Sequence, residues 1–417
     1  MRILSAAIGS VTATFFSPVE ELLPKCGNLR NCPELSDKAW IRLGLERALF
    51  ELSSGRACLQ EYAFRLPQCP PIANYFASLK SARRLALAQE LNQQLTQRIA
   101  ESLPDPLAGY ADLANFDLYA GDGHWHGAAA HDAPVDGTQY AVGHFYALDL
   151  RRHTLRHLAV GLGKKEHDMH VLKRLEIELL RQYAPIGRKV IYVWDKAGID
   201  FHAWHRWKQA NGLYFISLEK ENMHLKVMGN PDWDRTDPHN AGIQRVELVA
   251  GAAGVLVRRI CYLEPVTGVE YVFITNELTI RPGLIALLYK LRWNVEKVFD
   301  CLKNKLNEQQ AWATSDTAKS AQAQLICVLH NLIQILEERL RREGIENVAE
   351  IARRKKTLQR VQAMAAAAGR KIPDCVVLLQ RLTQCSVKLL RWLRSSLLDR
   401  LAWEAATPRL RALYTTL

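Results

Sequence analysis

No apolar run in this sequence reaches the roughly 18 residues that a membrane-spanning helix requires, so no membrane partner is expected. There is no CxxC pair, and the odd number of cysteines, nine, does not fit a framework of paired disulfides. Buried reduced thiols are the simplest interpretation, and they favour a cytoplasmic protein. Residues 1–16 carry one arginine and no convincing small-residue cleavage site, so a secretory signal is not expected. Internal repeats are absent as well, so no repeat architecture is predicted.

The chain does carry an excess of positive charge, +12 over 417 residues, and the position of this charge matters more than its size. From Arg339 to the end there are 17 Lys and Arg but only 6 Asp and Glu, a net charge of +11. This segment has a helical pattern and contains the run RRKK at 353–356. Such a region is either a phosphate-binding surface or a well-solvated pair of helices.

Three regions follow one another along the chain. Residues 1–110 read as helices; Ser36, for example, is a good N-cap for the amphipathic segment that follows it. Residues 111–310 alternate strands and helices, with a β-rich insertion at about 219–276. Residues 311–417 form the basic helical region. The sequence therefore predicts an α/β domain between two helical regions.

The middle region predicts a mixed sheet of five strands flanked by helices. The first strand ends at Asp122, and it and the next two strands suit an antiparallel meander. The run VIYVW reads as a buried central strand, and Asp195 follows it. The last two strands are each reached through a helix, so they are expected to be parallel additions. The expected elements are strands 113–122, 140–150, 154–162, 190–194 and 213–218 and helices 164–183 and 199–210.

A further helix, expected after residue 283, has its polar side chains sorted onto one side. At about 100° per residue, four of them fall within roughly 60° of one another: Tyr289, Arg292, Glu296 and Lys303. Four apolar side chains occupy the opposite side: Leu291, Val295, Val298 and Leu302. We expect the apolar side to dock on the sheet and the polar side to face away from it. A solvated helix face would usually mix its charges more evenly, so this side predicts a site.

Three acids are well placed to bind metal ions. Asp122 and Asp195 each close a strand, and sites in open sheets gather at strand ends. With Glu296 they would form a cage of carboxylate oxygens, which suits Mg²⁺ or Mn²⁺. Paired ions of this kind activate a nucleophile and stabilise the leaving oxygen in phosphoryl transfer. The polar neighbours on the helix would contact phosphates: Tyr289, Arg292 and Lys303.

These residues carry a resemblance to a known family. YKLRWNVEKVFDCLK at 289–303 matches Y-(2)-R-(3)-E-(6)-K, the signature of DDE transposases of the IS4 type. AGDGHWH around Asp122 and VWDKAGIDF around Asp195 resemble the two aspartate blocks of that family, and TNELT at 275–279 fits the approach to the signature helix. The resemblance covers roughly residues 110–310 and implies an RNase H-like core with a β-rich insertion between the second Asp and the Glu.

By this resemblance, Asp122, Asp195 and Glu296 would hold two catalytic metal ions. The enzyme would cleave double-stranded DNA at the transposon ends and join the freed 3′ hydroxyls to target DNA. The phosphates of the transposon end would be contacted by Tyr289, Arg292 and Lys303. Part of the family forms a hairpin intermediate, and the sequence leaves open whether one forms here.

The same resemblance implies a bacterial, cytoplasmic protein that acts as a homodimer on two DNA ends. The helical region 1–110 would then bind DNA. Some relatives flip a base against a tryptophan of the insertion. Trp233 is the nearest candidate for this role, with structural packing as the alternative.

Two other functions are compatible with parts of the sequence. The stretch HWHGAAAHD could supply a zinc metallohydrolase site from His124, His126, His131 and Asp132, because HxH after a strand is a zinc-ligand spacing. A barrel hydrolase needs strand–helix units from its start, however, and the first 110 residues lack them. The second alternative is a DNA-binding relic without catalysis, but such a relic should have lost one acid, and all three are present.

Overall fold

The structure is a computed structural model that describes residues 9–27, 29–52, 54–64, 69–162, 166–251, 254–306, 308–373 and 387–415. One nine-stranded sheet runs through its centre, in the order β3-β2-β1-β4-β5-β9-β8-β7-β6. The strands are β1 (Phe116–His126), β2 (Val142–Asp149), β3 (Leu155–Val160), β4 (Lys189–Val193), β5 (Leu213–Leu218), β6 (Lys226–Gly229), β7 (Ile243–Ala250), β8 (Leu256–Leu263) and β9 (Glu270–Thr275).

The first five strands have the arrangement expected of the RNase H-like core. β1, β2 and β3 pair antiparallel as a meander, while β4 pairs parallel to β1, and β5 pairs parallel to β4. The parallel strands are reached through helices, which is the connection that parallel pairing requires. The predicted α/β class and mixed sheet are therefore confirmed.

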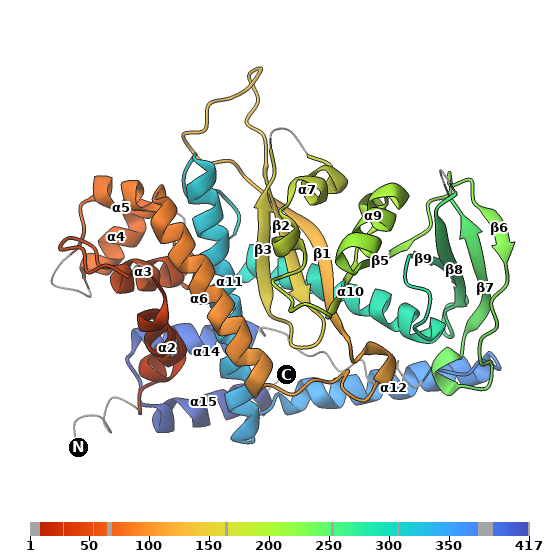
Figure 1. Cartoon of the computed structure of the whole chain (residues 1–417). Helices are drawn as coiled ribbons and strands as arrows, with labels where there is room; N and C mark the ends of the chain where they lie inside the picture. Colours follow the sequence, from red (N-terminus) through yellow and green to blue (C-terminus); the bar gives the residue numbers. More distant parts are fainter. Residues whose placement is uncertain are drawn as a thin grey trace.

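The β-rich insertion extends this sheet instead of forming a separate layer. β9 pairs antiparallel with β5, and β8, β7 and β6 follow it outward. In Figure 1 these strands lie at the right of the molecule, away from the meander. The five strands predicted for the core thus become nine in one sheet.

Helices cover both faces of the core strands. One face carries the short helices α7 (Asp168–Arg174) and α8 (Ile177–Leu180) and the longer α9 (Phe201–Asn211), which pack on alternate side chains such as Tyr192 and Phe215. The other face carries α10 (Pro282–Lys305), α11 (Asp316–Arg342) and α6 (Ala82–Ser102). The strands are buried on both faces, which is why VIYVW is apolar without interruption.

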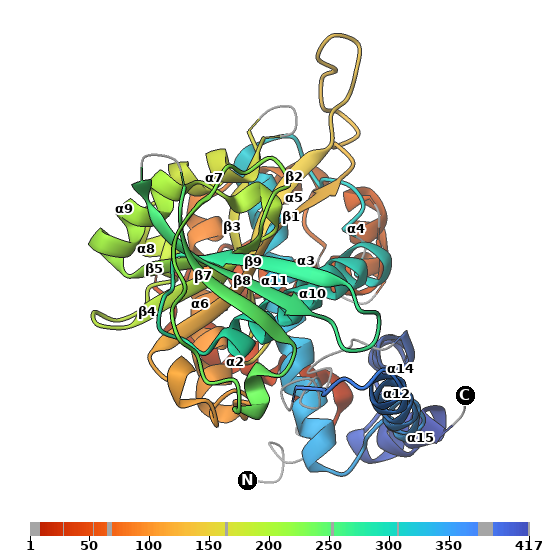
Figure 2. The same ribbon diagram turned by 90° about the vertical axis from the view of Figure 1, so that its right-hand side faces the viewer.

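The N-terminal and C-terminal helices pack together beside α11. They comprise α2 (Val11–Leu22), α3 (Asp37–Leu49), α4 (Gly55–Ala63), α5 (Ile72–Leu79), α12 (Val348–Ala367), α14 (Val387–Leu398) and α15 (Trp403–Thr415). Val11 donates a backbone hydrogen bond to Leu401, and the apolar residues of these helices, except those of α12, join those of α10 and α11 in one core. Figure 2, in which α12 is seen end-on, shows these C-terminal helices below the sheet, and Figure 1 shows α12 running from α15 along the lower side of the molecule.

Local signals explain where several elements begin and end. Ser36 caps α3 as predicted, because its hydroxyl accepts a hydrogen bond from the N–H of Ala39. Gly212 ends α9 with φ of 62°, a left-handed conformation that glycine adopts readily. Pro282 stands at the start of α10, where its missing N–H leaves no helical bond unmade.

Two predicted boundaries are wrong. β1 does not end at Asp122 but continues to His126, because its antiparallel partner β2 pairs with it up to that residue. The single helix predicted over 164–183 is, in its described part, two short helices, and the break follows α7 at Leu175, whose backbone is extended. Residues 164 and 165 lie outside the described residues.

No helix in the described parts of the chain combines the length and the apolar character needed to cross a membrane. Seven of the cysteines lie in the described residues, and five of these seven are buried. Cys69 is exposed and Cys32 is partly exposed, so burial of the thiols is confirmed for most of them but not for these two.

Candidate active site

The register of β1 and β4 brings Asp122 and Asp195 to the same level of the sheet. Ala120 and Val193 are the last paired residues of these two parallel strands. Asp122 and Asp195 each lie two residues beyond that pair, at the carboxyl edge of neighbouring strands. Ligand sites in open α/β sheets gather at this edge. Asp195 therefore follows the end of its strand as predicted, whereas Asp122 stands where β1 leaves β4 and runs on beside β2.

A tryptophan packed between two glycines fixes this part of the sheet. The Trp194 ring lies so close to Gly121 that an added Cβ would come within 1.7 Å of it, and the Cβ of a residue at 198 would come within 2.4 Å. Only glycine at 121 and 198 leaves room for the ring. The glycines of AGDGHWH and DKAGID thus let the strand ends that carry Asp122 and Asp195 approach closely.

Helix α10 links the third acid, Glu296, to Asp122 through an arginine. Arg292 on α10 reaches Asp122 at 3.2 Å and Glu296, one turn along the helix, at 2.8 Å. Its side chain is only 7% exposed, whereas that of Glu296 is 40% exposed. Arg292 therefore bridges two of the predicted metal ligands, with Glu296 on the solvent side.

Asp122 titrates abnormally because of its surroundings. Burial raises the pKa of Asp122 to about 7, Arg292 opposes the rise, and the nearby charges of Asp195 and Asp168 add to it. The N–H of Gly123 donates a 2.8 Å hydrogen bond to its Oδ1. A carboxyl held among other acids in this way is suited to a cation, which removes their repulsion.

Asp195 is held by the turn that follows β4. Its Oδ1 accepts a 2.7 Å hydrogen bond from the N–H of Ala197, and its carbonyl accepts one of 2.7 Å from the Ser217 hydroxyl on β5. Its position is thus set by two neighbouring strands.

The polar side of α10 is not exposed as a whole, so the expectation that it faces away from the sheet is wrong for two of its four residues. Tyr289 and Arg292 are both 6% exposed. Tyr289 packs against Phe273 of β9, with ring centroids 5.1 Å apart, and Arg292 turns toward β1. The helix lies over the carboxyl edge of the parallel strands, where the sheet itself presents acids. Tyr289 and Arg292 can therefore be buried while the apolar side of α10 packs into the main core.

The remaining predicted site residues lie further out. Lys303 is exposed on α10, two turns beyond Glu296. Trp233 is partly buried against the main core, with the Arg235 guanidinium 5.3 Å from its ring centroid. Its loop is tied to the N-terminal end of α10 through Asn240, which bonds to both the loop and Gly283. The structure does not bring Lys303 or Trp233 into contact with the acids.

Sequence reasoning missed Asp168, an acid close to Asp122 and Asp195. It begins α7 and accepts a 2.6 Å hydrogen bond from the Trp194 indole, and its charge raises the pKa of Asp122. Burial raises the pKa of Asp168 itself, and Asp195 adds to the rise. Its only sequence signal was its place in a polar stretch between two strands, which is common.

The histidines are arranged differently from the predicted zinc site. His126 groups with His144 of β2 and Glu308, not with His131 and Asp132. His131 is exposed, and Asp132 accepts a hydrogen bond from the N–H of Ala129 in its own loop. The set of four zinc ligands that was predicted from HWHGAAAHD is therefore not assembled among the described residues.

Comparison with known proteins finds a family that matches the part of the chain containing the three acids. The family described as transposase DDE domain matches residues 122–332, just over half of the 417 residues. The chain belongs to this family. The segment that matches the transposase domain begins at Asp122, includes Asp195 and Glu296, and ends within α11.

Other comparisons add less. None of the curated proteins matches this transposase-family chain. Among solved structures, it is similar to a chain of the cryo-EM structure of a piggyBac transposase synaptic complex with hairpin DNA. The TM-score is 0.38 at 10% sequence identity, with 94% of this chain and 86% of the other covered.

Proposed function

We propose that this chain is an IS4-type transposase that cleaves DNA at transposon ends and transfers the freed strands into target DNA. The observation that carries the proposal is the joining of Asp122 and Glu296 through Arg292 at the sheet edge where Asp195 also lies. These residues sit inside the segment that matches the transposase domain. Three acids converging in this way suit phosphodiester chemistry with divalent ions.

The donor set fits Mg²⁺ or Mn²⁺, and two ions are proposed. Asp122, Asp195 and Glu296 offer carboxylate oxygens only, which hard cations prefer. The raised pKa of Asp122, to about 7, reflects burial and acidic neighbours that a cation would compensate. When bound, such ions stabilise the charge that develops on the attacking and leaving oxygens of a phosphodiester.

The side chains of α10 would position the DNA. Arg292 would exchange part of its contact with the acids for a phosphate, since its planar guanidinium can serve two acceptors at once. Tyr289, held by Phe273, would donate a hydrogen bond to a neighbouring phosphate. Lys303, exposed two turns further on, would contact the backbone beyond the cleavage point.

Other parts of the chain would bind the rest of the DNA. We assign DNA binding to the helices of region 1–110 and to the basic region 311–417, around the catalytic region 111–310. Trp233 would serve base flipping only if its loop moved, because the ring is packed against the core. A homodimer is proposed for the complex with two DNA ends, and a hairpin intermediate remains one of two possible routes.

The test uses labelled DNA that carries the inverted repeats flanking the gene. We expect the full chain to nick or cut this DNA with Mg²⁺ or Mn²⁺ and not in EDTA. Asp122→Asn, Asp195→Asn and Glu296→Gln should each reduce the rate by on the order of 1,000-fold or more, because each removes a ligand of the ions. Binding of the DNA, measured by fluorescence anisotropy, should be retained.

Asp117→Asn is the matched control, because Asp117 lies on the same strand but pairs with Arg188 outside the site. It should cut at the wild-type rate. Normal cutting by Asp122→Asn would refute the catalytic assignment. DNA binding without cutting by the wild type would favour the relic instead.

A further inference from the structure

Strands β1 and β2 place three histidines side by side next to the proposed active site. His124 pairs directly with His144 across the two strands, and His126 is two residues further along β1, on the same face as His124. The His126 and His144 rings are stacked, with centroids 4.8 Å apart. Exposures are 6% for His124, 4% for His126 and 0% for His144, so the group is closed to solvent.

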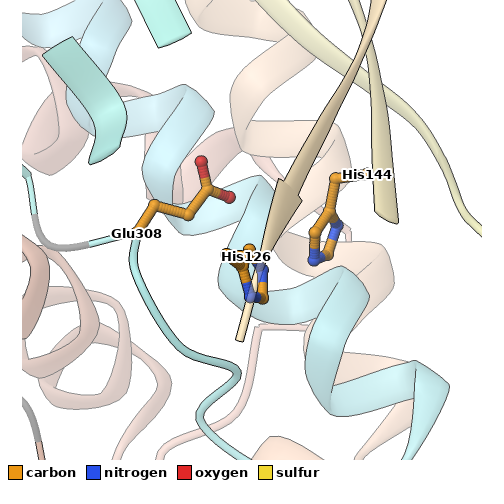
Figure 3. Close-up of side chains that lie close together, drawn as sticks. All are labelled: His126, His144 and Glu308. Atoms are coloured by element: carbon orange, nitrogen blue, oxygen red, sulfur yellow. The ribbon is translucent and has the colours of Figure 1, made fainter. Parts of the chain in front are cut away.

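A buried glutamate completes the group. Glu308, 0% exposed, follows the C-terminal end of α10, and its carboxylate points toward the two strands, as Figure 3 shows. One ligand atom from each of His126, His144 and Glu308 lies within 4.8 Å of the others. The segment is also tied to β1, since Gly127 donates a 2.8 Å hydrogen bond to Gln309.

Hydrogen bonds at Nδ1 leave Nε2 of both imidazoles able to carry a lone pair. His126 Nδ1 is 2.9 Å from the Gly127 carbonyl, so Nδ1 carries the proton and Nε2 carries a lone pair. His144 Nδ1 lies 3.2 Å from His157 Nε2, so one of these two nitrogens donates to the other. With the proton on His144 Nδ1, His144 Nε2 also carries a lone pair.

The glutamate presents a lone pair to the same space. Glu308 Oε1 accepts a 2.5 Å hydrogen bond from the Tyr146 hydroxyl. Within the described residues, its Oε2 has no hydrogen-bond partner, and neither have the Nε2 atoms of His126 and His144. Three buried acceptors that face one another without a donor are unfavourable unless a cation lies between them.

We propose that His126, His144 and Glu308 bind a Zn²⁺ ion that is separate from the ions of the proposed active site. Imidazole nitrogen with one carboxylate oxygen suits zinc far better than magnesium. His124 Nε2, 3.4 Å from Glu308 Oε2, supplies the fourth ligand. Zinc bonds of about 2.0–2.1 Å place tetrahedral ligand atoms roughly 3.4 Å apart, so the side chains close in slightly on binding.

The ion fastens the end of α10 to the sheet. Its ligands come from β1, from β2 and from the segment after α10, and the site has no opening for a substrate. It is therefore a structural site, as closed four-ligand zinc sites are. By holding α10 against β1 it fixes where Glu296 stands relative to Asp122. The second shell is already in place, because Gly127, His157 and Tyr146 orient the ligands.

The test measures zinc in the full chain without a histidine tag, grown with zinc and purified without chelators. Elemental analysis should give about one zinc per chain. After removal with a strong chelator, adding Zn²⁺ should raise the melting temperature by about 3 °C or more, and Mg²⁺ should not reproduce this. Co²⁺ added to the stripped chain should give the intense visible absorption of a tetrahedral site.

Variants then locate the ion. His126→Ala and the isosteric Glu308→Gln should each lose the bound zinc and the response of the melting temperature. His131→Ala, an exposed histidine on the adjoining loop, should keep both. Asp122→Asn should also keep the zinc, so this site is judged separately from the proposed cleavage activity.

Two results would overturn the assignment. One is a wild-type chain with less than ~0.1 zinc and no thermal response to Zn²⁺ or Co²⁺, which would mean that a proton on Glu308 serves the lone pairs instead. The other is zinc that persists in both His126→Ala and Glu308→Gln. Should a variant fail to fold, the Zn²⁺ titration of the stripped wild type still decides the question.

Discussion

Arg292 is the residue that connects two acids of the proposed active site. It carries the one cation in contact with Asp122 and Glu296 among the described residues, and it is nearly buried. It therefore has two opposite effects on a metal site. Its charge lowers the repulsion between the acids when no ion is present, and the same charge competes with an ion for their oxygens.

Replacing Arg292 should separate these effects. In Arg292→Gln we expect the turnover of DNA cleavage to fall by about 100-fold, because a preorganised phosphate contact is lost. The Mg²⁺ concentration for half-maximal activity should fall as well, because Asp122 and Glu296 are no longer paired with a cation. Cleavage assays over a Mg²⁺ titration measure both quantities.

Arg292→Lys should have a turnover and a Mg²⁺ requirement between those of the wild type and Arg292→Gln. Lysine keeps the charge but cannot serve two acceptors in one plane. Arg98→Gln is the control, because Arg98 pairs with Glu21 on the surface of α6 and should change neither quantity. A higher Mg²⁺ requirement in Arg292→Gln would show that the arginine supports ion binding instead of competing with it.

At the scale of elements, both ends of α10 are held by contacts with other parts of the chain. At its start, the N–H of Gly283 bonds to Asn240, and an added Cβ at 283 would come within 1.8 Å of the His239 carbonyl. At its end, the chain returns to the end of β1 through Gln309. The insertion therefore holds one end of α10 and the meander holds the other, so the position of Glu296 depends on both.

Helix α12 is the element best suited to bind DNA through its phosphates. Ala365 is its one buried residue, so nearly all of the helix is open to solvent. Arg353 and Arg354 both pair with Glu350, whereas Lys355 and Lys356 are exposed. Figure 1 shows α12 running along the lower side of the molecule, opposite α7.

The double variant Lys355→Gln/Lys356→Gln should weaken DNA binding by about 10-fold at low salt. It should also reduce the slope of log K against log salt by about 2, because two phosphate contacts are lost. Fluorescence anisotropy at several salt concentrations measures both.

Lys173→Gln on α7 is the matched control, because Lys173 is half-exposed but lies on the opposite side of the molecule and pairs with Asp200. If the double variant binds as the wild type does, α12 is a solvated helix and not part of the DNA path.

At the scale of the whole molecule, two sets of buried ionisable groups have opposite effects on how stability changes with pH. Burial lowers the pKa of a set of histidines: His124, His126, His144, His153, His157 and His330. Burial raises the pKa of several carboxyls, to about 7 for Asp122 and about 8 for Glu308. As the pH falls from 6.5 to 4, the histidines reduce stability and the carboxyls increase it.

A single histidine can be isolated by comparing variants. Burial lowers the pKa of His330 to about 4, so between pH 6.5 and 4 the unfolded chain binds a proton that the folded chain does not. The stability from this neutral histidine is complete above pH 6.5 and is lost as the pH falls through that window. As the pH falls through this window, the wild type loses stability that His330→Gln never had. The difference in unfolding free energy between the two proteins should therefore narrow by about 1.4 kcal/mol per pH unit.

Urea unfolding in EDTA at several values between pH 7.5 and 5 measures this gap. His131→Gln, at an exposed position, should show a gap that does not change with pH. A constant gap for His330→Gln would mean that this histidine titrates in the folded protein much as it does in the unfolded chain.

Periodicity and motif spacing predicted most of the catalytic region. VIYVW and the alternation of strands and helices predicted the α/β class, and the signature at 289–303 predicted the candidate residues of α10. Boundaries were less certain, because β1 is prolonged beyond Asp122 by pairing with β2, a partner that local sequence does not name. Local sequence also does not show that β9 pairs with β5, so it predicts five core strands and a separate insertion instead of one nine-stranded sheet.

The sequence by itself determined the fold class and the candidate site residues, because residue type and spacing are local properties. It could not determine that Arg292 lies buried between Asp122 and Glu296, since that depends on where α10 crosses the sheet. Asp168 and the group of His126, His144 and Glu308 also come from segments far apart in the chain. Only packing brings such side chains together, and only burial then changes their pKa values and removes their hydrogen-bond partners.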